Sequence, residues 1–336
     1  MVWGPVSDFR RPLGFEDALR PPVDVRRARI TRPVLRPPGR AGDAAAYGQL
    51  ARIIRRAPEV MVKVTGKTRD AGHLNRHLEY ISRNGTLTLE GPDGERLEGR
   101  SAVKALAADW AAEAAMAPGR RGDSPLSRSI VLSMPRGTDP MRLHDAARAF
   151  AAEAFGERFP YVFALHDEGG HPHVHLTVRA LGWDGSRLNP RKADLEVWRR
   201  RFAQALRDRG VEAEASPRRA RGMVRKAEQT PVRKMRERFA AGKGAAPRVM
   251  VSAWRQASTT PGRPAPWEAA IPERQTRIRR ALAAEAVALS RSDRPEDRAL
   301  AAALMDHLRR LPKVEMREAQ LSRLSGRERD PSGRDR

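Results

Sequence analysis

Residues 166–175 read His-Asp-Glu-Gly-Gly-His-Pro-His-Val-His and hold four of the eight histidines in the 336-residue chain. In a β-strand, side chains two positions apart point to the same face. His173 and His175 therefore share a face if this segment is a strand, while Val174 turns into a core. Neutral imidazole is a good ligand for divalent transition metals, and a third ligand from a neighbouring element would leave positions open for substrate. The spacing predicts a metal centre that does chemistry.

The identity of the third ligand is constrained by strand geometry. His171, His173 and His175 have the same parity, but together they span about 13 Å of extended chain, too far for a single ion. A second strand must therefore contribute, and His166 ends the preceding strand of a predicted hairpin closed by Gly169 and Gly170. His171 is left as a residue that supports a metal-ligating histidine or faces DNA.

The composition indicates a polyanionic partner. Lys and Arg outnumber Asp and Glu by 65 to 41, which gives a net charge of +24 and a sequence pI of about 11.4. The chain has no cysteine, so metal ligands must be histidine or carboxylate. We find no apolar run near the ~18 residues of a spanning helix and no signal-peptide pattern, so we expect a soluble intracellular protein with no membrane partner.

The elements that position these residues follow from periodicity and turn signals. We predict strands at residues 60–64, 128–134, 161–166 and 171–181, a hairpin at 86–98, and helices at 72–83, from Ser101, from Asp139-Pro140 and from Asn189-Pro190. Hairpins combined with helices between strands favour an α+β fold with a mainly antiparallel central sheet flanked by helices.

Changes in composition divide the chain. Residues 1–57 are rich in Arg and Pro and predict a basic, disordered N-terminal arm. Residues 58–215 predict the compact catalytic domain, and residues 216–250 a basic linker. Residues 251–324 predict a small helical region, with Leu300, Leu304, Leu308 and Leu311 near heptad spacing, and residues 325–336 a disordered tail.

Three motifs resemble those of plasmid relaxases, and they follow one another along the chain in the order of that family. The segment from His166 to His175 resembles the HUH motif, most closely that of the MOB-P mobilisation relaxases and the Ti-plasmid border endonuclease. Residues 77–85, His-Leu-Glu-Tyr-Ile-Ser-Arg-Asn-Gly, match the nucleophile pattern of that family, and Ser133 matches its strand serine. The resemblance covers residues 59–215.

The resemblance implies an HUH endonuclease-like fold and a specific reaction. Tyr80 would attack a phosphodiester of single-stranded DNA at a plasmid transfer origin, giving a 5′-phosphotyrosyl adduct and a free 3′-OH. His166, His173 and His175 would hold a divalent metal ion, Mg²⁺ or Mn²⁺ in function with Zn²⁺ as a further candidate. The implied setting is the bacterial cytoplasm, with accessory mobilisation proteins and a type IV secretion coupling protein as partners.

The sequence leaves several candidates for the base that activates Tyr80. His77 lies three residues before Tyr80, on the same side of the predicted helix, and is a candidate base or orienting group. His166 and Asp167 compete for that role, and Asp167 could also fix an imidazole tautomer.

Phosphate contacts are expected from arginines. Arg191, Arg199, Arg200 and Arg207 follow the polar side of the helix after the histidine strand, and we expect them, together with Arg83, to bind the DNA backbone. A merely solvated helix face is the alternative.

Two other functions stay open. The chain could be a non-catalytic DNA-binding accessory protein that keeps the relaxase fold. It could also be a metal-dependent hydrolase that uses activated water, in which case Tyr80 would be a structural residue.

Overall fold

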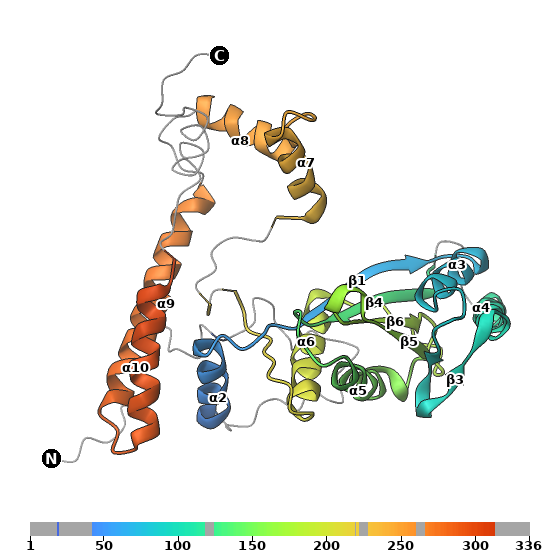
Figure 1. The fold of residues 1–336 in the computed structure, drawn as a ribbon, viewed down its shortest axis with the longest axis horizontal. Coiled ribbons are helices and arrows are strands. Elements are labelled where there is room, and N and C mark those ends of the chain that lie inside the picture. Colours follow the sequence, from blue (N-terminus) through green and yellow to red (C-terminus); the bar gives the residue numbers. More distant parts are fainter. Residues whose placement is uncertain are drawn as a thin grey trace. The chain divides into compact units, whose positions relative to one another are not determined.

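A computed structural model describes residues 19, 42–117, 124–218, 220–221, 228–259 and 266–312 (Figure 1). The chain divides into two compact units, one formed by residues 21–216 and the other by residues 1–20 with 217–336. The predicted metal-binding and nucleophile segments all lie in the unit of residues 21–216.

This unit is built on one six-stranded sheet with the order β1-β4-β6-β5-β2-β3, in which every neighbouring pair is antiparallel. The strands are β1 (Met61–Thr68), β2 (Leu89–Glu90), β3 (Arg96–Leu97), β4 (Ser127–Ser133), β5 (Tyr161–His166) and β6 (His173–Arg179). Short 3-10 turns, η2 (Pro92–Gly94) and η4 (Glu168–Gly170), close the β2–β3 and β5–β6 hairpins. The predicted α+β fold with an antiparallel sheet is confirmed.

Two pairs of helices cover the two faces of the sheet (Figure 1). α3 (Ala71–Ile81) and α4 (Gly99–Met116) pack on one face, and α5 (Pro140–Ala151) and α6 (Lys192–Arg207) pack on the other. A π-helical turn, η3 (Ala152–Gly156), continues α5. α5 begins where the sequence predicts, because the Asp139 carboxylate accepts the backbone N–H groups of Met141 and Arg142.

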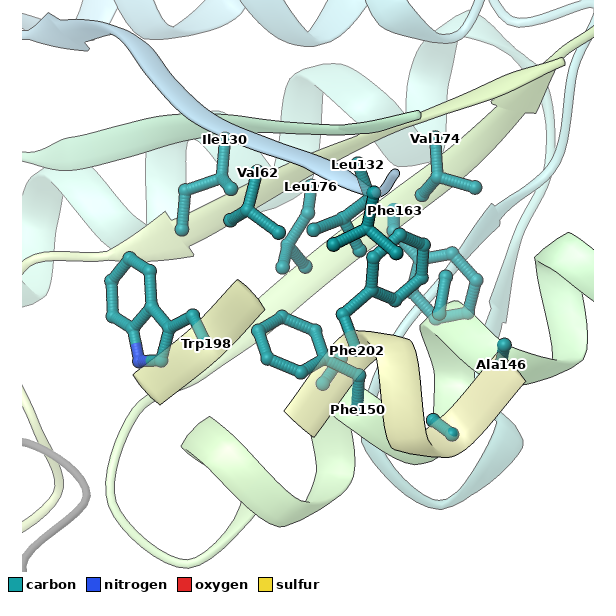
Figure 2. Packing of buried hydrophobic residues seen from close by; sticks show 14 of the residues in the cluster. Val62, Ile130, Leu132, Ala146, Phe150, Phe163, Val174, Leu176, Trp198 and Phe202 are labelled. Atoms are coloured by element: carbon teal, nitrogen blue, oxygen red, sulfur yellow. The ribbon is translucent and has the colours of Figure 1, made fainter. Parts of the chain in front are cut away.

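The larger core lies between the sheet and the α5–α6 pair. Phe150 of α5 and Trp198 and Phe202 of α6 are fully buried beneath the strands, as Figure 2 shows. Val174 and Leu176 of β6 enter this core. Because side chains alternate along a strand, His173, His175 and Thr177 must face the α3–α4 side.

Several element boundaries differ from the sequence prediction, among them those of α4, α6 and β6. α4 begins at Gly99 after Glu98, two residues before the expected cap at Ser101. α6 begins after Arg191 instead of at Asn189, because the Asp194 carboxylate accepts the Arg191 backbone N–H at 2.7 Å and fixes the first turn there. β6 begins at His173, after Pro172, which has no N–H to donate to the ladder.

The expected disorder of the N-terminal arm is corrected for its last part, and most of the arm lies outside the described residues. α2 (Gly42–Ile54) is a helix with Leu50 and Ile53 buried. Glu214 binds it through Gln49 at 3.1 Å and Arg52 at 2.6 Å. The composition of this segment alone indicated disorder. The burial of two apolar side chains and the contacts with the buried carboxylate of Glu214 stabilise it as a helix.

The second unit consists of helices in its described part: α7 (Thr230–Ala240), α8 (Arg248–Thr259), α9 (Pro266–Ser290) and α10 (Pro295–Arg310). α7 and the start of α8 occupy the stretch where the sequence suggested a linker. Leu282 and Leu289 of α9 and Leu304 of α10 are buried, while the predicted tail at residues 325–336 lies outside the described residues. None of the helices in the described residues is both long and apolar enough to cross a membrane.

Candidate active site

Tyr80 lies on the exposed flank of α3. Leu74, Leu78 and Ile81 form the buried seam of this helix, which fixes its rotation on the sheet. Tyr80 lies outside the seam and remains 55% exposed. The Asp70 carboxylate accepts the His73 backbone N–H at 2.7 Å at the start of the helix. A phenol that the packing leaves accessible can reach a substrate.

The chain reverses just after Tyr80 through a turn with three left-handed residues. Arg83, Asn84 and Gly85 have φ values of 51°, 58° and 83°. A Cβ atom on Gly85 would lie 2.5 Å from the Arg100 backbone nitrogen, so only glycine fits at this position. The turn brings Arg83 back beside Tyr80.

The strand register brings the three predicted metal ligands together. His166 of β5 pairs with His173 of β6, and His173 pairs with Ser133 of β4. His175 lies one row further along β6, on the same face. One ring nitrogen from each of His166, His173 and His175 falls within 4.8 Å of the other two. These residues form the histidine cluster.

Hydrogen bonds leave a nitrogen lone pair available on each imidazole. His166 Nε2 lies 2.7 Å from the Ile81 carbonyl oxygen, so this nitrogen donates and Nδ1 carries no proton, with Arg83 Nη2 at 3.4 Å from it. His173 Nδ1 lies 3.0 Å from the His171 carbonyl oxygen, which likewise leaves Nε2 bare. His175 Nε2 is buried and has no hydrogen-bond partner among the described residues. Three converging lone pairs, one of them buried without a partner, fit a divalent cation.

Burial favours the neutral form of two of these imidazoles, those of His166 and His175. It lowers the pKa of His175 to about 3, and the nearby His166 and His173 contribute to that lowering. The pKa of His166 is also lowered, mainly by burial. Neutral imidazole is the form that binds metal, so the lowered pKa values of His166 and His175 favour cation binding at neutral pH.

Tyr80 lies against this cluster. Its ring centroid is 5.7 Å from that of His175, in an edge-on arrangement, and 6.4 Å from that of His166. The Arg83 guanidinium lies 5.5 Å from the Tyr80 ring centroid. A phenol, a potential cation site and a guanidinium thus meet at one end of α3.

Glu168 is a site residue that the sequence prediction missed. Its carboxylate forms an ion pair with Arg83, whose Nη2 also lies 3.4 Å from His166 Nδ1. Asp167, the predicted residue, is exposed and makes no side-chain hydrogen bond or ion pair with the described residues. Glu168 lies in the η4 turn and reaches Arg83 there, and no periodicity in the sequence could indicate that contact.

His77 contacts the sheet from α3, and its role as a base or orienting group for Tyr80 stays a prediction. Its Nε2 lies 2.9 Å from both the Ser129 and the Thr177 hydroxyl oxygens, which belong to β4 and β6. Burial, with a smaller effect from His73, lowers its pKa to about 4. His77 therefore ties α3 to the sheet, and Ser129 and Thr177 are its unpredicted partners.

Ser133 is buried in the row of His173, and its hydroxyl donates to the Met134 carbonyl oxygen at 3.4 Å. His171 is exposed and contributes its carbonyl oxygen to His173.

The α6 arginines lie on the other face of the sheet, away from the histidine cluster. Arg199 binds Glu196 at 3.0 Å and Glu59 at 3.5 Å, and Arg200 lies 3.4 Å from Glu196. Arg207 donates to the Ala213 carbonyl oxygen at 2.7 Å, while Arg191 is exposed. Of the five arginines expected to bind DNA, the structure brings Arg83 alone to the cluster.

Comparison with known proteins agrees with this geometry. Residues 80–211 match the family described as Relaxase: MobA/VirD2-like, nuclease domain. Over this stretch, which is less than half of the chain, the protein is similar to relaxases. The relaxase match begins at Tyr80 and includes all three histidines of the cluster.

Individual relatives of the relaxase domain are curated border endonucleases. The T-DNA border endonuclease VirD2 of Rhizobium radiobacter is 28% identical over 185 residues, which cover 49% of this chain and 43% of that protein. VirD2 of Agrobacterium fabrum is 28% identical over 185 residues, 49% of this chain and 41% of that protein. The chain therefore spans less than half the length of these curated relatives. The solved MobM relaxase domain bound to a 26-nucleotide oriT DNA is 15% identical, with a TM-score of 0.37, and covers 51% of this chain and 96% of that chain.

Proposed function

We propose that this protein is a relaxase that nicks single-stranded DNA at a plasmid transfer origin for conjugative mobilisation, with Tyr80 as the nucleophile. The observation that carries the proposal is the exposed Tyr80 ring beside the histidine cluster. The match of residues 80–211 to the relaxase nuclease domain supports the choice of DNA as substrate.

In the proposed reaction, the Tyr80 oxygen attacks the scissile phosphorus. A bond forms between that oxygen and phosphorus, and the bond from phosphorus to the 3′ oxygen breaks. Tyr80 gives up its phenolic proton and the departing 3′ oxygen takes one up, so the products are a 5′-phosphotyrosyl adduct and a free 3′-OH. A second 3′-OH can reverse the step and rejoin a strand, so the enzyme would also be a strand transferase.

Arg83 is well placed to assist this step. Its guanidinium lies 5.5 Å from the Tyr80 ring centroid, so it can reach a phosphate that Tyr80 attacks. A guanidinium also matches the geometry of phosphate oxygens, so Arg83 would orient the scissile group once it leaves Glu168. Ser133 would support His173 from the adjacent strand.

His166, His173 and His175 would hold the divalent cation. A bound Mg²⁺ or Mn²⁺, or Zn²⁺ as a further candidate, would stabilise the negative charge that develops on the phosphate oxygens. Mg²⁺ and Mn²⁺ are common in phosphoryl chemistry, whereas a three-histidine site favours later transition metals.

We also propose a division of the chain into domains and a set of partners. Residues 58–215 are the catalytic domain, preceded by the arm of residues 1–57. Residues 216–250 are a basic linker, and residues 251–324 form a small helical region. The tail at residues 325–336 follows it. Accessory mobilisation proteins and a type IV secretion coupling protein in a bacterial cytoplasm are the proposed partners.

A covalent-adduct assay tests the function. Incubation with a labelled single-stranded origin oligonucleotide and Mn²⁺ or Mg²⁺ should give a protein band that carries DNA. Tyr80→Phe removes one oxygen from an exposed ring, so it should abolish the adduct while leaving DNA binding nearly intact. Tyr47→Phe, which removes a phenol of α2, is the matched control and should keep full activity.

Other results of this assay would indicate a different nucleophile or a different function. An adduct that persists in Tyr80→Phe would show that another residue is the nucleophile. Cleavage without any adduct would indicate a hydrolase that uses activated water. Metal-independent binding without cleavage would indicate a non-catalytic DNA-binding protein with this fold.

A further inference from the structure

The edge strand β1 leaves a strip of the sheet uncovered next to the histidine cluster. Met61 is 46% exposed, and Lys63 and Thr65 are also exposed. Lys63 pairs with Val131, which in turn pairs with His175, so Lys63 and His175 lie in one row and on one face. Neighbouring strands are about 4.8 Å apart, so the Lys63 backbone lies about 10 Å from that of His175.

The flank of α3 borders the same strip. His77 points down to Ser129 of β4 and Thr177 of β6, which fixes which side of α3 faces these strands. His73 and Tyr80 are exposed and lie four residues before and three residues after His77, so they follow that side of the helix. Arg76, also exposed, lies four residues before Tyr80 and is its neighbour along the helix.

Two positive charges of this strip have no protein partner in the described part of the chain. Lys63 and Arg76 form no ion pair and no side-chain hydrogen bond with the described residues. Glu79, the acidic residue of α3, is directed to Arg100 of α4, 3.6 Å away. The α6 arginines are the opposite case, because Arg199, Arg200 and Arg207 already bind protein groups.

We propose that the strip formed by Met61, Lys63, Thr65, His73, Arg76 and Tyr80, named the β1–α3 surface, binds the DNA strand that leads into the active site. Lys63 and Arg76 contact successive phosphates, and Met61 offers an apolar surface to a base. The inference rests on the proposed function and adds the path of its substrate. The path runs over the face of the sheet that carries the histidine cluster, away from α6.

Charge and position favour DNA as the occupant of this surface. A phosphate held at the histidine cluster has its neighbours one nucleotide away on either side, and Lys63 is the exposed cation in the row of His175. Unpaired cations bind phosphates at a lower cost than cations that must first leave a carboxylate. The exposed, largely polar strip next to the nucleophile suits a flexible single strand, which is held by a basic groove and apolar contacts.

Salt dependence of binding tests the proposal. The experiment uses the full chain carrying Tyr80→Phe, with EDTA present, and measures the fluorescence anisotropy of a labelled single-stranded oligonucleotide over a range of salt concentrations. Removing one cation that neutralises a phosphate should reduce the slope of log affinity against log salt by roughly 0.7. Lys63→Ala and Arg76→Ala should each show this reduction, and Lys63→Glu should weaken binding further.

Arg200→Ala on α6 is the matched control, since it removes one partly exposed arginine from the opposite face. We expect its slope to match that of the parent protein. Unchanged slopes for Lys63→Ala and Arg76→Ala, with a reduced slope for Arg200→Ala, would overturn the proposal and place the DNA on α6. Thermal melting of each variant, monitored by circular dichroism, distinguishes weaker DNA binding from a failure to fold, because variants at the exposed positions Lys63 and Arg76 should melt like the parent.

The proposed function can fail independently of this surface. Binding in EDTA by a Tyr80→Phe protein needs no cleavage, whereas the adduct assay uses the protein with Tyr80 intact. Reduced slopes at Lys63 and Arg76 without any adduct would retain the DNA path and reject the nicking reaction. An adduct with unchanged slopes would retain the reaction and reject the path.

Discussion

His77→Gln asks whether His77 anchors α3 or takes the proton of Tyr80. His77 Nε2 lies within hydrogen-bond distance of the Ser129 and Thr177 hydroxyl groups, and burial lowers its pKa from 6.5 to about 4. Glutamine can keep one hydrogen bond to these hydroxyl groups but cannot titrate. The two roles therefore predict different changes in stability and in activity.

The magnitude follows from the pKa difference. Above pH 6.5 His77 is neutral in both the folded and the unfolded chain, so its contribution to stability is complete. As the pH falls below 6.5 the unfolded chain binds a proton that the folded chain refuses until about pH 4. At ~1.4 kcal/mol per pKa unit, His77 should lower the free energy of unfolding by about 3 kcal/mol between pH 7 and pH 4.

The measurement is urea unfolding of the parent and of His77→Gln at pH 7 and pH 4, with EDTA present. His166 and His175 titrate in both proteins, so their effects cancel in the comparison. We expect the parent to lose about 3 kcal/mol more than the variant on acidification. His77→Leu, which removes the hydrogen-bonding partner that the two buried hydroxyl groups share, should be less stable than the parent by about 1–3 kcal/mol at pH 7.

The adduct assay decides the role. An anchor predicts that His77→Gln still forms the phosphotyrosyl adduct at pH 7, at a reduced rate. If His77→Gln abolishes the adduct while the pH dependence of unfolding matches that of the parent, His77 is the base and its assignment as an anchor is wrong.

The rest of the site makes three further predictions. His173→Ala and His175→Ala should each remove metal-dependent cleavage while His171→Ala keeps most of it, and equal losses in a cleavage assay with Mn²⁺ would show that the ligand assignment is mistaken. Glu168→Gln should free the guanidinium of Arg83 and tighten binding of single-stranded DNA at low salt; unchanged or weaker binding in an anisotropy titration would contradict this. Gly85→Ala should lower the free energy of unfolding by more than about 1 kcal/mol, because the new Cβ atom meets backbone at positive φ, and a melting temperature equal to that of the parent would refute the strain.

Local patterns in the sequence determined several elements of the fold and the placement of the site residues on them. The two-residue period at His173 and His175 placed both imidazoles on one face, and the cap of Asp139 followed by Pro140 marked the start of α5. The apolar seam of Leu74, Leu78 and Ile81 predicted α3 with Tyr80 beside it. These features depend on neighbours within a few residues, so periodicity and capping chemistry are sufficient to predict them.

Tertiary packing decided which face of the sheet each element covers. The amphipathic pattern of α6 shows that one side is buried, but not against which face, so the sequence could not tell that its arginines lie away from the histidine cluster. The same limit applies to His77, whose partners Ser129 and Thr177 lie 52 and 100 residues away along the chain. Glu168 reaches Arg83 because of the left-handed turn after α3 and the β5–β6 turn together. Such contacts join residues distant in sequence, and only the register and packing of the folded sheet bring them within reach.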